Sequence, residues 1–344
     1  MAKTNIEWTR GDDGSAGVTW NPITGCDRVS PGCDNCYALT MAKRLKGMGS
    51  AKYQTDGNPE TSGPGFGITS HAAAIREPLR WKNPRRVFVN SMGDLFHAGI
   101  HEADLHLVFG VMAATPQHTY QVLTKRHGRM RSLLNNPTFA HMTYHRAAMV
   151  FGLPETAPRP WPLPNVWLGV SVEDQHWADI RIPALLNTPA AVRFLSCEPL
   201  LGPVRLNRNH AHCPTHDFTG GFCTGPCPDL VRPNWVICGG ESGRNARPAA
   251  LDWFRTLRDD CAAANIPYFF KQHGEYRGFL THAEGPRPAD LYVNTETGEA
   301  LPEAQVPDTG SWSGVWRLGK KQAGRTLDGR EWSDFPVTAE APCG

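Results

Sequence analysis

The 344-residue sequence lacks long hydrophobic runs and a strong net charge, and each absence excludes a class of protein. No stretch approaches the roughly 18 apolar residues of a membrane span, so we expect no membrane partner. The first residues lack the apolar core of a signal peptide, which predicts a cytoplasmic protein. The formal net charge of +2 excludes a strongly basic nucleic-acid coat and allows only a local basic patch.

The composition is that of a folded protein with many loops. Hydrophobic residues make up 40% of the chain and charged residues 20%, which is enough to build a core. The 34 glycines and 29 prolines indicate loops rather than long helices. Most of the ten cysteines fall into two tight clusters, and clustered cysteines in a cytosolic chain indicate metal before disulfides.

Short apolar runs alternate with helical patterns along the chain. Runs of β-branched, aromatic and aliphatic residues, typical of strands buried on both faces, open the segments 86–96, 119–126, 165–174, 191–201, 234–243 and 266–274. Amphipathic helices are predicted at 37–48, 103–114, 176–187 and 251–264. The alternation predicts the α/β class and, within it, a partial (β/α) barrel of parallel strands.

Polar residues follow each predicted strand at the same end. In barrels of this kind the working residues gather at the C-terminal ends of the strands. This rim would carry Asn90, Ser91, Asp94, Thr124, Lys125, Arg126, Ser171, Glu173, Asp174, Glu198, Glu241, Ser242, Lys271 and Gln272. Any one of them could be an ordinary loop residue, but the repetition over six strands predicts one functional face.

Two segments interrupt the alternation. Residues 207–232 are rich in Cys, His, Gly and Pro and look like an insertion between two strands. Residues 275–344 do not show the alternation of strand and helix patterns, and they are predicted to form an irregular extension that packs on the barrel. The predicted domains are therefore a barrel over 1–274, which contains the insertion, and the extension over 275–344.

The first cysteine cluster has the spacing of an open metal centre. Cys26, Cys33 and Cys36 follow the pattern Cys-x6-Cys-x2-Cys. Structural zinc sites normally close with four ligands, whereas a four-iron cluster on three thiolates leaves one iron free for a small molecule. A zinc site completed by a distant residue and ordinary thiols are the alternatives. A helix starting at Tyr37 would point its positive end at the cluster.

The second cluster lies in the insertion and mixes cysteine with histidine. Short spacing of these two residue types in a loop is typical of structural zinc. The candidate ligands are Cys213, Cys223, Cys227, His210, His212 and His216, and Zn²⁺ would bind four of them. An auxiliary iron–sulfur cluster and the absence of metal are the alternatives.

The chain resembles a known family over most of its length. The matching stretches are NIEWT, TWNPITGCDRVSPGCDNCYA, FVNSMGDLFH, VLTKR, GVSVEDQ, EPLLGP, GGESG, FFKQHG and GKKQAGRTLDGREW. On these stretches it is identified as a member of the phage and bacterial three-cysteine-motif family of uncharacterised phage proteins. The layout of that family resembles the radical S-adenosylmethionine (SAM) superfamily.

The resemblance implies a [4Fe–4S] cluster on Cys26, Cys33 and Cys36 whose open iron binds SAM. In that superfamily a reductant, such as a flavodoxin-type electron donor, supplies the electron that cleaves SAM to a 5′-deoxyadenosyl radical. The first cysteine gap here is six residues instead of three. Asn35 stands where an aromatic residue usually precedes the third cysteine, and the aromatic Tyr37 comes after it.

The resemblance also implies a setting and residue roles. The phage setting favours repair or base modification of nucleic acid in bacterial or phage-infected host cytosol, with a further partner protein expected. The expected cofactor-binding residues are Ser91, Asp94, Ser171 and Tyr37, with 91–94 near the amine of SAM. The expected catalytic residues, which would orient SAM and substrate, are Lys125, Glu173, Glu198, Glu241 and Lys271.

The alternative hypothesis is a non-catalytic, zinc-stabilised protein that binds nucleic acid or a partner. Both cysteine clusters would then be structural zinc sites that stabilise their loops. Basic groups such as Lys43, Arg44 and Lys46 would contact phosphates. The same cations would equally suit a solvated surface. This hypothesis explains the rim poorly, because carboxylates repel phosphate.

Overall fold

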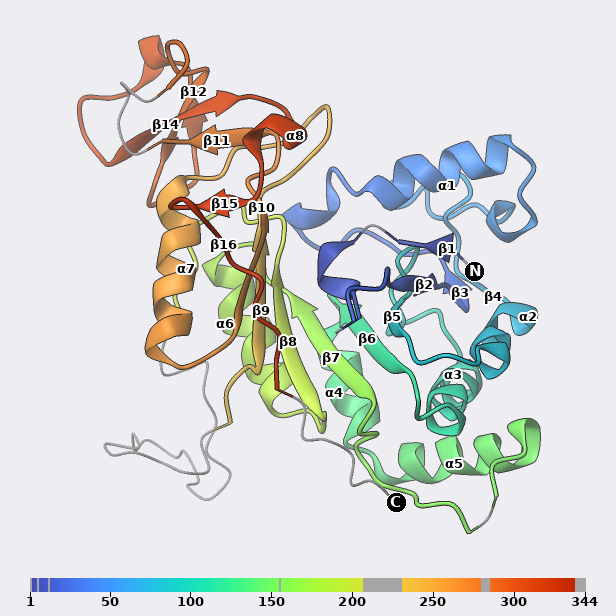
Figure 1. Cartoon of the computed structure of the whole chain (residues 1–344). Coiled ribbons are helices and arrows are strands. Elements are labelled where there is room, and N and C mark those ends of the chain that lie inside the picture. The colour runs from blue at the N-terminus through green and yellow to red at the C-terminus, as the bar shows by residue number, and fades with distance from the viewer. Residues whose placement is uncertain are drawn as a thin grey trace. The chain divides into compact units, whose positions relative to one another are not determined.

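The computed structural model describes residues 2–4, 6–11, 13–154, 156–206, 231–279 and 285–337 (Figure 1). The chain divides into two compact units. Unit 1 comprises Met1–Val170 and Asn187–Arg193, and unit 2 comprises Ser171–Leu186 and Phe194–Gly344.

Unit 1 is built on parallel strands that follow one another in chain order. They are β2 (Val18–Trp20), β5 (Arg86–Val89), β6 (Thr119–Thr124) and β7 (Val166–Ser171), with β1 (Ala2–Lys3) antiparallel to β2. All six residues of β7 are buried, as expected of a strand covered on both faces. The ladder β3 (Ile23–Thr24) with β4 (Thr69–Ser70) lies outside this sheet.

The α-helices of unit 1 include three that the sequence analysis does not predict. They are α2 (Ala72–Ile75), α4 (His127–Leu134) and α5 (Pro137–Phe151), and the other α-helices are α1 (Tyr37–Gly47) and α3 (Glu102–Ala114). The 3₁₀ turns are η1 (Glu7–Thr9), η2 (Pro31–Cys33), η3 (Ala51–Tyr53) and η4 (Glu77–Arg80). A local signal for α5 exists, because the side chain of Asn136 caps the N–H of Thr138 and Pro137 is the first helical residue.

Unit 2 continues the same pattern with strands that also run parallel. They are β8 (Val192–Cys197), β9 (Trp235–Gly239) and β10 (Tyr268–Gln272), accompanied by α6 (Gln175–Leu186) and α7 (Leu251–Ala263). In sheet order the seven parallel strands are β2-β5-β6-β7-β8-β9-β10, a half-barrel. The predicted α/β class and partial barrel are thereby confirmed. Among the described residues, no helix is long and apolar enough to cross a membrane.

The residues after 274 are not irregular, so that part of the prediction is wrong. The strands β11 (Tyr276–Gly278), β12 (Leu291–Asn294), β13 (Ala300–Leu301) and β14 (Trp312–Arg317) form an antiparallel sheet in the order β11-β14-β12-β13. The short helix α8 (Lys320–Ala323), the turn η7 (Glu303–Gln305) and the hairpin β15 (Thr326–Leu327) with β16 (Arg330–Glu331) complete it. These strands are only partly buried, so they lack the continuous apolar runs that identify the buried strands β5 to β10 in the sequence.

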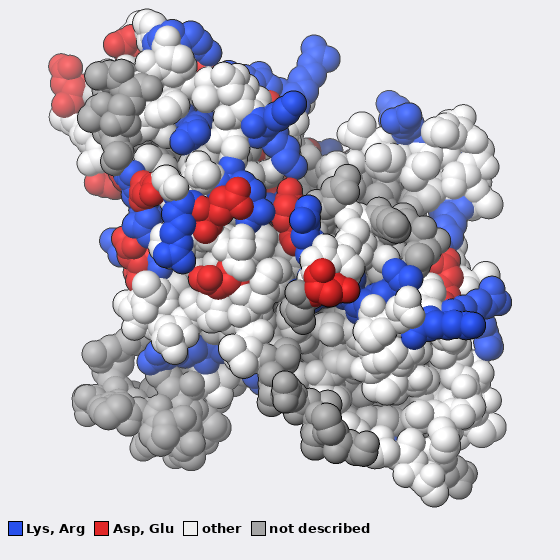
Figure 2. Space-filling model, viewed as in Figure 1, with Lys and Arg blue, Asp and Glu red and all other residues white. Residues whose placement is uncertain are grey.

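The hairpin β15–β16 is attached to α7 by charge pairs. Asp328, at the tip of the hairpin, accepts hydrogen bonds from Arg255 at 2.5 Å and from Arg258. Figure 2 shows basic and acidic side chains side by side over this hairpin and α7. The paired guanidinium groups lower the pKa of Asp328 to about 2.

The predicted insertion at 207–232 falls almost wholly on residues 207–230, which are outside the described residues. The zinc prediction for Cys213, Cys223, Cys227, His212 and His216 therefore stays a prediction. The predicted domain boundary at residue 274 likewise stays a prediction.

Candidate functional site

The three cysteines lie in one loop of unit 1, between β3 and α1. Gly25, directly before Cys26, has φ of +97° and pairs with Gly93 in the segment after β5. A Cβ at Gly25 would lie 2.3 Å from a backbone oxygen, so only glycine fits. Cys33 ends the turn η2, and Cys36 is the N-cap of α1. The helix start predicted at Tyr37 is confirmed.

The three thiols are partly buried, and Cys33 interacts with each of the other two. Cys26 and Cys36 both pack against the apolar cluster of Ala38, Ala42, Tyr53, Phe66 and Met92. Burial raises the pKa of Cys26 to about 12 and also raises the pKa of Cys36. Cys33 contributes to both increases, so its sulfur lies within electrostatic range of Cys26 and of Cys36.

Two cations that follow β6 face these thiols. The guanidinium of Arg126 donates to the carbonyl of Asp27 at 2.9 Å and lies 3.9 Å from the sulfur of Cys26. This charge opposes the effect of burial on the pKa of Cys26, and Lys125 opposes it in the same way for Cys36. The two cations therefore offset part of the effect of burial, which still keeps the pKa of both thiols raised.

Asp94 connects the end of β5 to the end of β6. Its carboxylate accepts hydrogen bonds from the hydroxyl of Thr124 at 2.7 Å, the N–H of Lys125 at 2.9 Å and the N–H of Phe96 at 3.0 Å. Asp94 is buried, and its charge raises the pKa of Cys26. The carboxylate thus fixes the turn that carries both cations.

Tyr37 and Ser91, which the sequence places in cofactor binding, lie in contact. The hydroxyl of Tyr37 donates to the carbonyl of Ser91 at 2.6 Å. The hydroxyl of Ser91 and the side chain of Asn21 are 3.2 Å apart, and Asn21 also accepts from the N–H of Met92 at 2.9 Å. Four of the predicted site residues, Tyr37, Ser91, Asp94 and Lys125, therefore surround the cysteine loop.

A hydrogen-bond network that the sequence analysis does not identify holds the loop beside the first cysteine. Asp27 accepts from the hydroxyls of Thr61 at 2.6 Å and Ser62 at 2.8 Å. Nδ1 of His97 accepts a backbone N–H, so Nε2 carries the proton and donates to Asp27 at 2.9 Å. Burial raises the pKa of Asp27, but these three bonds outweigh burial and lower it.

Asn90, at the end of β5, is a buried amide in an uncommon backbone conformation. It is 4% exposed and has φ of +58°. Neither its side-chain nitrogen nor its side-chain oxygen has a partner among the described residues. An unpaired buried amide costs about 1–3 kcal/mol, whereas Asn tolerates the left-handed region better than most residues. Such costs concentrate at binding sites, where a ligand satisfies the group.

In unit 2 the predicted residues at the end of β7 form a buried structural pair. Glu173 is fully buried and accepts from Arg181 at 2.7 Å. The same guanidinium donates to the carbonyl of Ser171 at 2.8 Å and lies over the ring of Trp177. These contacts attach α6 to the end of β7.

The remaining predicted carboxylates of unit 2 are also ion-paired. Lys271 donates to Glu198 at 2.6 Å, so the structure brings these two predicted residues together. Glu241 accepts a forked pair of bonds from Arg247 at 2.9 and 2.7 Å. Both pairs lie at the C-terminal ends of strands, as the sequence predicts.

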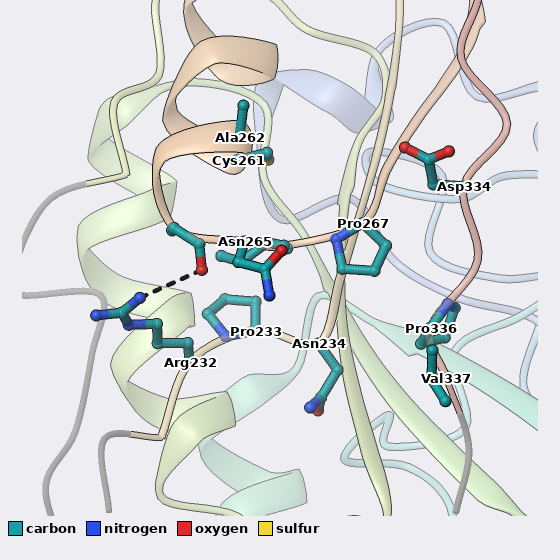
Figure 3. Close-up of a pocket in the computed structure, with 12 residues that line it drawn as sticks. Arg232, Pro233, Asn234, Cys261, Ala262, Asn265, Pro267, Asp334, Pro336 and Val337 are labelled. Carbon is teal, nitrogen blue, oxygen red and sulfur yellow. Dashed lines mark hydrogen bonds between the residues drawn. The ribbon is translucent and has the colours of Figure 1, made fainter. Parts of the chain in front are cut away.

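A pocket of about 630 Å³ lies elsewhere in unit 2 (Figure 3). Its lining includes Asn234 and Pro267, which directly precede β9 and β10. Arg232, at its edge, donates to the carbonyl of Ala264 at 3.2 Å. The pocket is therefore at the N-terminal ends of these strands, opposite the ends that carry Glu241 and the other predicted residues.

The donor set of the cysteine loop suits an iron–sulfur cluster. Within the described ranges, no group of three or more His, Cys, Asp or Glu side chains that could hold a single metal ion is found. In a [4Fe–4S] cluster each thiolate binds a different iron, so the sulfurs stand further apart than the ligands of one ion. Three cysteine thiols in one loop supply the donor type that such a cluster requires.

Comparison with known proteins places the whole chain in one family. A family model described as protein of unknown function (DUF5131) matches residues 3–336. Neither the curated proteins nor the solved structures give a significant match. The matched range includes the cysteine loop, its facing cations and the ion pairs of unit 2. The chain therefore belongs to the DUF5131 family of proteins of unknown function.

Proposed function

We propose that this protein is a radical SAM-type enzyme in which Cys26, Cys33 and Cys36 hold a [4Fe–4S] cluster. The observation that supports this most is the group of three interacting, half-buried thiols faced by Lys125 and Arg126. When bound, the cluster would supply the electron that cleaves SAM and starts radical chemistry on the substrate. The family resemblance drawn from the sequence points to the same chemistry.

The segment 90–94 supplies polar groups for SAM. The amide of Asn90 offers an acceptor for the ammonium group and a donor for the carboxylate, and it has no other partner among the described residues. The carboxylate of Asp94 is occupied by Thr124 and Lys125. We therefore assign SAM contact to Asn90 and Ser91, and a positioning role to Asp94.

The chain's own charges prepare the thiols for metal. Metal ligation requires thiolates, and burial opposes deprotonation by raising the pKa of Cys26 to about 12. Arg126 offsets part of this cost at Cys26, and Lys125 offsets part of it at Cys36. The network around Asp27 holds the loop rigid, so little order has to be gained when metal binds.

We infer nucleic acid as the substrate class, for repair or base modification. Unit 1, which contains the cysteine loop, has 19 Lys and Arg against 12 Asp and Glu, a net charge of +7. Unit 2 has 16 against 21, a net charge of −5. The net positive charge of the unit that holds the cysteine loop favours a polyanionic substrate.

Anaerobic reconstitution with iron and sulfide tests the enzyme proposal, read by EPR after dithionite reduction with and without SAM. We expect a [4Fe–4S]⁺ signal that changes when SAM is added. Replacing Cys26, Cys33 or Cys36 with Ser should remove the signal. Cys261→Ala, which alters a buried cysteine of α7, is the matched control and should keep it.

The opposite result would favour the zinc-stabilised binding protein. In that case the protein would take up no cluster and would instead retain about one or two tightly bound zinc ions. A cluster whose EPR signal ignores SAM would also contradict the proposal, because the open iron would then not be the SAM site.

A further inference from the structure

One face of α1 is exposed and begins at the cysteine loop. Tyr37, Met41, Arg44 and Met48 recur at intervals of four, three and four residues, so they share one side of the helix. Tyr37 is 57% exposed, Met41 39% and Met48 69%. An adjacent side of α1 packs on the core through Ala38 and Ala42. Large apolar side chains left this exposed mark an interaction surface.

Arg44 lies on this face, and Lys43 lies on the adjacent side of the helix, so both place positive charge beside it. Lys43 and Arg44 are exposed, and neither makes an ion pair with another described residue. Lys46, on another side of the helix, is already paired with Asp56 at 2.5 Å. With unit 1 at a net charge of +7, the face is complementary to a polyanion.

The ring of Tyr37 is a fixed platform. Its hydroxyl donates to the carbonyl of Ser91 at 2.6 Å, which sets the orientation of a ring that stays more than half exposed. Aromatic rings that lie beside positive charges are the usual stacking sites for unpaired bases. Since Tyr37 directly follows Cys36, a base stacked on it lies beside the cysteine loop.

We propose that single-stranded nucleic acid docks on the α1 face formed by Tyr37, Met41, Arg44 and Met48, with Lys43 on the adjacent exposed side of the helix. The ring stacks on a base, the two cations contact phosphates, and the flexible methionines pack against sugars and base faces. Stacking on a side chain requires an unpaired base, which selects single strands over duplex. This inference rests on the proposed function for its meaning as substrate binding, but the docking itself does not require the cluster.

The test measures binding of a fluorescein-labelled oligothymidylate to the full chain by anisotropy over a range of salt concentrations. Each phosphate contact contributes about −0.7 to the slope of log K against log salt for single strands. The double variant Lys43→Ala/Arg44→Ala should therefore bind with a slope about 1.4 less negative. The matched control is Lys320→Ala/Lys321→Ala, an adjacent exposed pair on α8 in unit 2, which should leave the slope unchanged.

Variants of Tyr37 separate stacking from charge. Tyr37→Leu should weaken oligothymidylate binding by roughly fivefold or more, since one stacked base contributes about 1–3 kcal/mol. Tyr37→Phe keeps the ring and should retain most of the affinity. A duplex of the same length should bind more weakly than the single strand.

The proposal is overturned if oligothymidylate fails to bind at low salt, or if the Lys43/Arg44 variant keeps the wild-type slope. Equal affinity for duplex would overturn the stacking role. EPR on the same preparations distinguishes the two proposals. Oligonucleotide binding without a cluster would support the docking face and contradict the enzyme proposal. A SAM-responsive cluster without oligonucleotide binding would contradict only the docking proposal and would favour an acidic protein partner on this face.

Discussion

At the scale of single residues, charge and burial oppose each other around the cysteine loop. Burial and the negative charge of Asp94 raise the pKa of Cys26, while Arg126 lowers it. Burial dominates, so the metal-free thiol stays protonated at neutral pH. The balance explains why a ligand with its own positive charge, such as iron, is needed to hold Cys26 as thiolate.

This balance predicts the alkylation behaviour of Cys26. Because its pKa is raised to about 12, the thiolate fraction of the metal-free protein should rise about tenfold per pH unit between pH 7 and 9. The rate of iodoacetamide labelling, followed by mass spectrometry of the peptide, should rise in proportion. In the unfolded chain the same peptide should approach a plateau above about pH 9. A plateau in the folded protein would contradict the burial of this thiol.

Glu173 illustrates a second residue-scale distinction, between a buried structural pair and a reactive group. Its carboxylate and Arg181 are both fully buried. Glu173→Ala should destabilise the protein by about 3–5 kcal/mol in denaturant unfolding, because an uncompensated guanidinium stays buried. Glu198→Ala, which breaks a more exposed pair, should cost clearly less. If both variants lost the same small amount of stability, Glu173 would not be part of a buried ion pair with Arg181.

At the scale of elements, short and distant segments are joined by a few directed contacts. The hairpin β15–β16 depends on Asp328, whose carboxylate binds two arginines of α7. Asp328 has φ of +52°, a conformation that Asn also tolerates. Asp328→Asn therefore removes charge without backbone strain.

The Asp328 pair predicts a pH-dependent contribution to stability. The folded pKa of about 2 lies below the unfolded value, so the stabilisation is present above about pH 4 and is lost as pH falls toward 2. Asp328→Asn should lower the free energy of unfolding by about 0.5–1 kcal/mol at pH 7, since the carboxylate is partly exposed. The difference in free energy of unfolding between the variant and the wild type should become smaller at pH 3. Asp308→Asn, at an exposed carboxylate, should show neither effect.

At the scale of the whole molecule, charge and candidate chemistry are concentrated in one unit. Unit 1 holds the cysteine loop, its cations and the α1 face, and its net charge is opposite in sign to that of unit 2. The ion pairs of Glu173, Glu198 and Glu241 all belong to unit 2. A cluster bound at the cysteine loop is therefore expected to stabilise unit 1 and not unit 2.

Reconstitution should consequently protect unit 1 selectively. A ligand that binds only the folded loop stabilises the structure around it by mass action. Hydrogen exchange should slow in residues 25–36 and in the first turns of α1 after iron and sulfide are added. Exchange in α7 serves as the internal reference and should stay unchanged. Uniform protection of both segments would contradict a site confined to the cysteine loop.

The sequence by itself determined the elements whose signals are local. The apolar runs that became β5 to β10, the helix beginning at Tyr37 and the three-cysteine spacing are all readable within a few residues, because burial on both faces and helix starts leave local patterns. The polar strand ends were readable for the same reason. The partial barrel and the three cysteines of the candidate site were therefore predictable from the sequence.

Only the tertiary structure decided which of these groups meet. Arg126 contacts the sulfur of Cys26, which is 100 residues away in the sequence. Asp94 accepts a hydrogen bond from the N–H of Lys125, which is 31 residues away. The unpaired amide of Asn90 and the antiparallel order after residue 274 also depend on neighbours that are remote in sequence. Periodicity reports how one segment faces the core, but hydrogen bonds, ion pairs and pKa shifts depend on distances in space, which chain folding alone sets.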